Sequence, residues 1–240
     1  MNRTRRHPRS NSNTSPNLQP VGTPRFRYRV RFAKTGLLRW ISHRDLANLW
    51  ERIGRRAELP FSMTEGFHPK PRMQFPSALS LGVESLDEVL DLELSEEWPA
   101  DQLLERLQQD DQPGLTIQSV RQVDLADGKA QLAAMDYRVT LPEPWDDAEA
   151  SRTAAAIETL SKQDIVSIER KGKTVTAHVA THIPVLDLQP DQLVARIVTA
   201  DGASLKIQDI LDLLGLSDWP ERGATLIRTG MTLKGELEHS

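Results

Sequence analysis

The chain has 240 residues, of which 38% are hydrophobic and 27% charged, an ordinary balance for a folded soluble protein of one or two domains. Cysteine is absent, which excludes disulfides, thiol nucleophiles, and zinc or iron–sulfur sites held by cysteine. No apolar run approaches the roughly 20 residues that a membrane-spanning helix needs. Arg3, Arg5 and Arg6 are not followed by the apolar stretch of a secretory signal, so we expect a cytoplasmic protein.

The net charge of −4 hides an uneven distribution. Residues 1–82 hold sixteen basic and four acidic residues, a net +12, whereas the remaining residues carry −16. A basic front favours an anionic partner, with nucleic acid as the first candidate. We give equal weight to the alternative that the two parts of the chain neutralise each other or that the charges lie on solvated faces.

Residues 1–24 are rich in Ser, Asn, Thr, Pro and Arg, and are expected to form a disordered basic tail because they offer little apolar surface to bury. A strictly alternating run follows at 25–32, which predicts a strand with two distinct faces. One face carries Arg25, Arg27, Arg29 and Arg31, and the other carries Phe26, Tyr28, Val30 and Phe32.

A helix is predicted to begin after Ser42, an effective N-cap, with Asp45 in its first turn. Its apolar residues recur at helical spacing, and the helix closes before Leu59-Pro60. Short strands and an irregular loop follow at 59–82, then a strand at 88–94, a helix after Pro99 and a strand at 115–123. This β-α-β-β-α-β order predicts a ferredoxin-like half over residues 25–124.

Residues 134–233 repeat the theme in element order, with additions. We expect a strand at 135–141, a helix at 146–163, a hairpin at 165–180 that turns at 171–173, a strand at 194–200, a helix at 207–214 and a strand at 224–233. The predicted fold class is therefore α+β, with two ferredoxin-like halves in tandem after the basic tail.

The segment Phe32–Asp45, which contains Lys34, Gly36, Arg39, Trp40, Ser42, His43 and Asp45, resembles the opening of the radical-SAM-linked proteins, a domain family of unknown function. The resemblance continues in the same order through Leu59-Pro60, Glu65–Pro71 and Leu81–Ser85, with Glu88 at the spacing that the family shows. It covers about residues 26–94. The family usually has Asn at the position of His68 and often His at that of Lys70.

The resemblance implies a function through a partner. Members are fused to radical-SAM proteins or encoded beside one, and a radical-SAM enzyme needs a three-cysteine cluster motif, which this chain lacks. The chain would then be a stand-alone accessory protein that binds no cofactor itself. S-adenosylmethionine and the iron–sulfur cluster are expected on the partner, and RNA is one candidate substrate.

Two segments supply the candidate ligand-binding residues. The first is the helix start, Arg39, Ser42, His43, Arg44 and Asp45, where free N–H groups and nearby arginines favour an anion. The second is the proline-held loop with Glu65, Gly66, Phe67, His68, Lys70 and Arg72, whose interleaved aromatic and basic residues suit single-stranded nucleic acid. An equally weighted alternative for this loop is a structural turn whose Phe67 fills the core.

Arg25, Arg27, Arg29 and Arg31 would contact phosphates if their sheet face is open, or form interface ion pairs if a second domain covers it. His178 and His182 have no obvious third ligand, so no metal site is expected. Three functions remain: the accessory protein, an independent RNA-binding protein, and, least favoured, a hydrolase using His43 and His68 with Asp45 or Glu65. No catalytic residue is assigned, since Ser42 and Asp45 are better explained as helix-start residues than as triad members.

Overall fold

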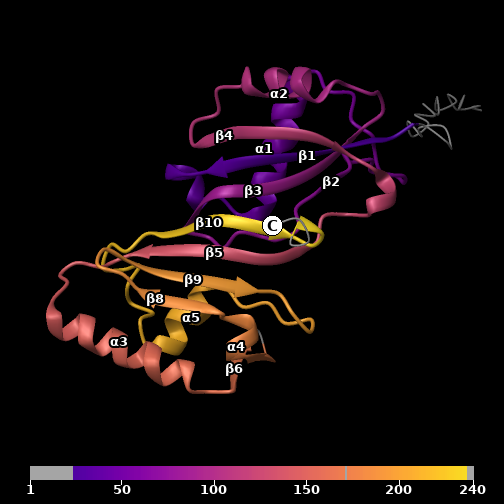
Figure 1. Ribbon diagram of the computed structural model, residues 1–240. Helices are drawn as coiled ribbons and strands as arrows, with labels where there is room; N and C mark the ends of the chain where they lie inside the picture. Colours follow the sequence, from indigo (N-terminus) through magenta and orange to yellow (C-terminus); the bar gives the residue numbers. More distant parts are fainter. Residues whose placement is uncertain (1–23, 171, 237–240) are drawn as a thin grey trace, which may run out of the picture.

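The computed structural model describes residues 24–170 and 172–236. Its strands form one mixed eight-stranded sheet in the order β4-β1-β3-β10-β5-β9-β8, with β2 paired to β3, and a separate two-stranded sheet of β6 and β7. Figure 1 shows this sheet running through the whole molecule, with α1 and α2 at its upper end and α3, α4 and α5 at its lower end. The fold is therefore α+β, as predicted.

The first half comprises β1 (Phe26–Lys34), η1 (Gly36–Trp40), α1 (His43–Arg56), β2 (Met73–Gln74), β3 (Val83–Leu94), α2 (Ala100–Gln108) and β4 (Leu115–Val123). The second half comprises η2 (Leu125–Asp127), β5 (Leu132–Thr140), α3 (Asp147–Ser161), β6 (Ile165–Arg170), β7 (Lys173–His178), α4 (Val179–His182), β8 (Val185–Leu188), β9 (Gln192–Val198), α5 (Ile207–Leu214) and β10 (Leu226–Leu233).

The alternation at the start of the described chain builds the core of the first half. Tyr28, Val30 and Phe32 are fully buried, because β1 lies between β3 and β4 and turns these side chains toward the helices. The matching apolar face of α1 is buried over the same core, through Leu46, Leu49, Trp50 and Ile53. The predicted strand and helix are both confirmed.

The second half has its own core, which gathers side chains from β5, β9 and β10 and from α5. The helix and hairpin predicted after residue 146 are present as α3 and as β6 with β7, although residue 171 in the turn lies outside the described residues. β8 was not predicted: its four residues, Val185–Leu188, are too few to show a clear alternation.

The two halves meet where β10 joins β3. This pair is parallel and short, with a register of Leu226 to Val83, Ile227 to Glu84 and Arg228 to Ser85. β10 also pairs with β5 in antiparallel fashion, so the last strand of the described chain lies between the halves and makes their sheet continuous.

The basic tail predicted at 1–24 falls outside the described residues except for Pro24. In the described part of the chain, no helix is both long enough and apolar enough to cross a membrane.

Candidate functional site

The arginine face of β1 is covered with carboxylates from the neighbouring strand. Arg27 donates to Glu93 at 2.9 Å, and Arg29 makes a two-pronged contact with Asp91 at 2.7 and 2.9 Å. The paired residues face each other in the β1–β3 register. Both arginines are buried, with 7% and 8% of their surface exposed. The prediction that they contact phosphates on an open surface is therefore wrong, because both side chains are buried and held by carboxylates.

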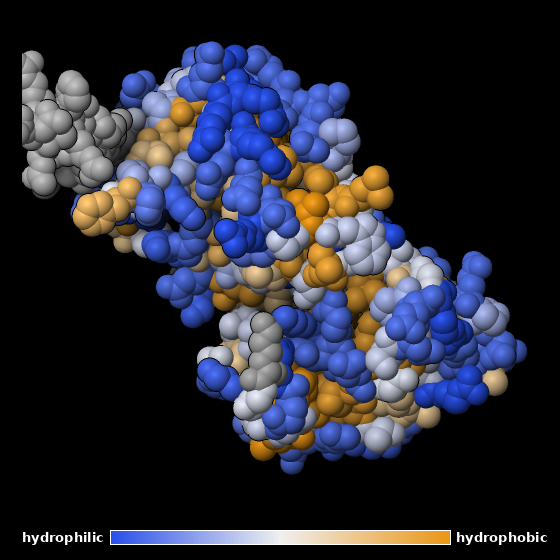
Figure 2. Space-filling view, turned by 180° about the vertical axis from the view of Figure 1, so that it is seen from behind, coloured by the Kyte–Doolittle hydropathy of each residue, from blue (hydrophilic) through white to orange (hydrophobic). Residues whose placement is uncertain are grey.

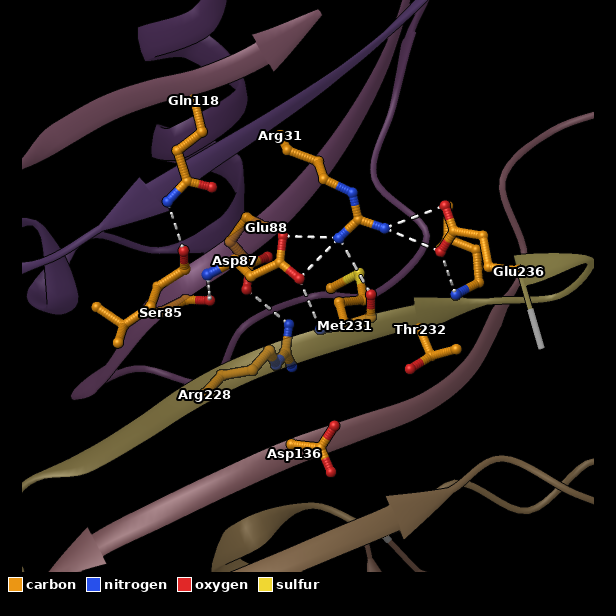
Figure 3. A network of polar contacts seen from close by, with 12 residues as sticks. Arg31, Ser85, Asp87, Glu88, Gln118, Asp136, Arg228, Met231, Thr232 and Glu236 are labelled. Carbon is orange, nitrogen blue, oxygen red and sulfur yellow. Dashed lines mark hydrogen bonds and ion pairs between the residues drawn. The ribbon is translucent and has the colours of Figure 1, made fainter. Parts of the chain in front are cut away.

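The other two arginines of this face are also paired. Arg25 lies 3.5 Å from Glu93, and Arg31 contacts Asp87 at 2.7 Å and Glu236 at 2.9 Å. Figure 3 shows the Arg31 guanidinium between these two carboxylates. The uneven charge distribution is thus balanced within the chain: the basic N-terminal strand pairs with acidic residues that come later in the sequence. The four arginines form intramolecular ion pairs rather than an exposed phosphate-binding surface.

The start of α1 is a capped helix end. Ser42 accepts the backbone N–H of Asp45 at 3.2 Å, and its hydroxyl donates to the Asp45 carboxylate at 2.7 Å. The His43 ring packs edge-on against Phe75, with 5.1 Å between ring centroids. Ser42, His43, Asp45 and Arg44 are exposed, and the observed contacts do not link Ser42 to His43 as a nucleophile and its base.

Two of the motifs noted in the sequence lie against each other. Arg39 contacts Glu84 at 3.3 Å, and the backbone N–H of Gly36 donates to the same carboxylate at 3.1 Å. Gly82 donates to the Arg39 carbonyl at 2.8 Å. A Cβ on Gly82 would stand 3.1 Å from the Trp40 ring, and its φ is +80°, so this close packing requires glycine. η1 and the start of β3 therefore form one unit.

This unit exposes a cluster of large apolar side chains. Leu37 is 87% exposed, Trp40 57% and Leu81 60%. Leu37 and Trp40 are three residues apart in a 3-10 helix, so they project from the same side, and Trp40 packs on the glycine next to Leu81. We call these three residues the apolar patch. Figure 2 shows hydrophobic surface gathered near the narrowing between the upper and lower parts of the molecule.

The loop predicted to contact a ligand is a hairpin with an exposed tip. Thr64 donates to the Lys70 carbonyl at 2.8 Å, and the Lys70 N–H returns a bond to the Thr64 hydroxyl at 3.0 Å. Phe67 at the tip is 88% exposed, so the alternative in which it fills the core is wrong. His68, Glu65, Gly66 and Lys70 are also exposed.

A polar pocket of about 150 Å³ lies at the base of this hairpin. Its lining comes from the hairpin, β1, β2, β3 and the segment after η2: Arg27, Thr64, Pro71, Arg72, Met73, Gln74, Asp91, Glu93 and Lys129. Of these, Arg72 was predicted as a ligand-binding residue. Gln74 and Lys129 were missed, since neither belongs to a motif and Lys129 is brought in by the fold alone.

A buried group of charges lies at the junction of the halves. Arg228 donates to Glu88 at 2.7 Å and to the Tyr137 hydroxyl at 2.9 Å. Lys34 is also buried, at 1% exposure, with Ile41 O at 3.5 Å. Burial lowers the pKa of Lys34, and Arg228 lowers it further while Glu88 opposes the shift. This cluster was not predicted, because its members come from four strands.

Within the described residues there is no group of three or more His, Asp or Glu side chains that could hold a metal ion. His182 is instead buried between two carbonyls, with Nδ1 at 3.0 Å from His178 O and Nε2 at 3.2 Å from Ala200 O.

Residues 27–207 match the model of a family described as an uncharacterized protein conserved in bacteria (DUF2344). No curated protein matches the chain. Among solved structures, a chain from a crystal structure of a Cbf5-Nop10-Gar1 complex is similar over 85% of this chain and 48% of that one, with 11% identity and a TM-score of 0.40. The present chain thus spans about half of that one.

Proposed function

The chain belongs to this uncharacterized bacterial family, and we propose that it acts as an accessory, non-catalytic partner of a radical-SAM enzyme that docks the enzyme and presents or recognises its substrate. The resemblance of residues 26–94 to radical-SAM-linked proteins supports the identity of the partner. In this proposal S-adenosylmethionine and the cluster belong to the partner, and the complex forms in the cytoplasm.

The observation that carries the proposal is the apolar patch. Burying a leucine or tryptophan side chain contributes roughly 1.5–3 kcal/mol, so three such side chains left in solvent are unfavourable for an isolated chain. Exposed apolar clusters on soluble domains commonly mark surfaces that bind another protein. Here two separate motifs, held together by Glu84 and Gly82, place Leu37, Trp40 and Leu81 outward.

The same proposal extends to the architecture. We propose that the two halves are ferredoxin-like units in tandem. The strand order β4-β1-β3-β2 of the first half has its counterpart in the order β10-β5-β9-β8 of the second, which places the elements of each half in the same relative sequence. The hairpin of β6 and β7 and the short helix α4 would then be additions to the second unit.

An independent RNA-binding role is the second candidate. Its support is the hairpin tip, where exposed Phe67 and His68 stand beside exposed Lys70, a combination that suits base stacking and phosphate attraction. The hydrolase is the least favoured candidate, because Ser42 is engaged as a helix cap and His43 packs on Phe75. Turnover that disappears in a folded His43→Ala variant would support it.

Co-purification with the radical-SAM protein encoded beside this chain tests the docking proposal. The full-length chain is expected to retain that protein, and Leu37→Ser and Leu81→Ser to weaken retention at least tenfold. Ile165→Ser is the matched control, because Ile165 is 50% exposed but lies in β6. Absence of association for the unmodified chain, or equal loss in the control, rejects the proposal.

A further inference from the structure

The polar pocket under the hairpin contains two carboxylates that are already neutralised. Asp91 accepts two hydrogen bonds from the Arg29 guanidinium and one from the backbone N–H of Ala130 at 3.0 Å. Glu93 receives Arg27. A metal cation entering the pocket would have to displace an arginine from each carboxylate, so the pocket is not built for a cation.

Two basic side chains of the same pocket have spare donors. The Arg72 Nε donates to the Met63 carbonyl at 2.9 Å, and no contact with the rest of the described chain engages its two terminal nitrogens. Lys129 is exposed and makes no ion pair or hydrogen bond within the described residues. The pocket thus offers an uncompensated guanidinium from the hairpin and an uncompensated ammonium from the segment after η2.

A third group points to a ligand independently of charge. The Gln74 Oε1 atom is buried and has no hydrogen-bond partner, which is unfavourable for an amide oxygen removed from water. An amide oxygen only accepts hydrogen bonds, so Gln74 Oε1 suits a ligand donor such as a sugar hydroxyl rather than an anionic oxygen.

We propose that this pocket binds a phosphate group of a nucleotide, held by Arg72 and Lys129, with Gln74 accepting from a hydroxyl of the attached sugar. Guanidinium and ammonium groups are the usual protein partners of phosphate oxygens, and charged donors shorten and strengthen such bonds. The volume of about 150 Å³ is enough for one phosphate group with part of its sugar.

The hairpin tip gives the nucleotide a place for its base. Thr64 and Pro71 line the pocket and mark the two ends of the tip, so exposed Phe67 lies three residues beyond the Thr64 wall. An aromatic ring near a phosphate site allows base stacking without sequence readout. The pocket is at the start of β1 and the apolar patch lies beyond its end, about 25 Å away for a strand of this length, so this inference does not rest on the docking proposal.

Calorimetric titration of the full chain tests the site with three probes: inorganic phosphate, uridine 5′-monophosphate and a single-stranded oligouridine. The unmodified chain is expected to bind at least one nucleotide probe, and Lys129→Gln and Arg72→Gln are expected to weaken that binding about tenfold or more. Lys162→Gln is the matched control, since Lys162 is an exposed lysine at the C-terminal end of α3 and does not line the pocket.

The probes separate the sources of the phosphate. Binding of the monophosphate supports a free nucleotide as the ligand. Binding of oligouridine alone supports a single strand, and the slope of log affinity against log salt concentration should then be smaller by about 0.7 in Lys129→Gln. Because Arg72 also bonds to Met63, circular dichroism checks the fold of its variant, and exposed Lys129 provides the independent test. Lack of binding by every nucleotide probe, or equal affinities of Lys129→Gln and Lys162→Gln, overturns the proposal.

Discussion

Arg228 in β10 donates to Glu88 in β3 at 2.7 Å, and this buried ion pair ties the C-terminal half to the N-terminal one. The two strands share only three register pairs. The arginine is also held by the Tyr137 hydroxyl in β5, so three strands meet at one guanidinium. The ion pair therefore adds a side-chain connection between two strands that share few backbone hydrogen bonds.

Removing one partner of this pair is expected to be strongly destabilising. Glu88→Ala leaves a buried guanidinium with only the Tyr137 hydroxyl, and breaking a buried pair in this way typically lowers the free energy of unfolding by about 3–5 kcal/mol. Urea unfolding measures the change. Glu84→Ala, on the same strand but in a more exposed contact with Arg39, is the control and should lose under about 1 kcal/mol. Equal losses in both variants contradict the assignment.

The buried Lys34 gives the protein a specific alkaline pH dependence. Burial lowers the pKa of Lys34 below its usual value near 10.4. At a pH between the folded and unfolded pKa values, the unfolded chain therefore binds the proton more strongly than the folded chain does. Stability attributable to this residue therefore rises with pH between the folded and unfolded pKa values. Lys34→Met should be more stable than the unmodified chain at neutral pH and lose that advantage as pH approaches the unfolded value.

Chemical unfolding at several pH values measures this difference, with exposed Lys162→Met as the control. A constant difference between the Lys34→Met and unmodified proteins across the alkaline range contradicts the expectation.

Arg29 and Asp91 should behave as a coupled pair. Arg29→Met leaves the Asp91 carboxylate with only the Ala130 N–H, and is expected to lower the free energy of unfolding by about 3–5 kcal/mol. The double variant Arg29→Met with Asp91→Leu replaces both charges by apolar groups of similar size and should recover most of the loss. A double-mutant cycle by urea unfolding checks this, and additive losses would show that the two residues act separately.

Gly54 is buried inside α1, where alanine would normally be favoured by about 1 kcal/mol. Here a Cβ would stand 2.1 Å from the Phe61 ring, so Gly54→Ala should instead destabilise by about 1–3 kcal/mol. Combining it with Phe61→Leu should relieve the overlap and reduce the difference. Thermal unfolding of the four proteins tests this, and a stabilising Gly54→Ala alone would contradict the packing.

Sequence patterns over a few residues predicted the features of the fold that depend on neighbouring residues. The alternation at 25–32 assigned each side chain of β1 to the correct face, and Ser42 to Asp45 identified the helix start, because both depend on residues a few positions apart. The same pattern could not supply the partners of the arginines: Asp91 and Glu93 lie more than 60 residues away. Lys34 was missed for a related reason: it lies two residues after Phe32 on the same buried face, but its charge suggests a solvent-exposed position, and Glu88 and Arg228 beside it come from other strands.

The candidate site divides in the same way. The hairpin residues Phe67 and Arg72 were recognisable from composition, whereas Lys129 reaches the pocket from a different segment and carries no local signal. The apolar patch required the contact of Trp40 with Gly82, which joins two motifs whose proximity only the folded sheet establishes.

The placement of β10 also bears on how the chain acquires its structure. β3 pairs with β1 early in the sequence, but the parallel edge that receives Leu226–Arg228 stays unpaired until nearly all of the described chain is available. Unpaired strand edges recruit other chains, and pairings distant in sequence form slowly. A ribosome-bound or truncated chain ending before residue 226 is thus expected to be prone to self-association, so late folding intermediates are the state most in need of chaperone protection.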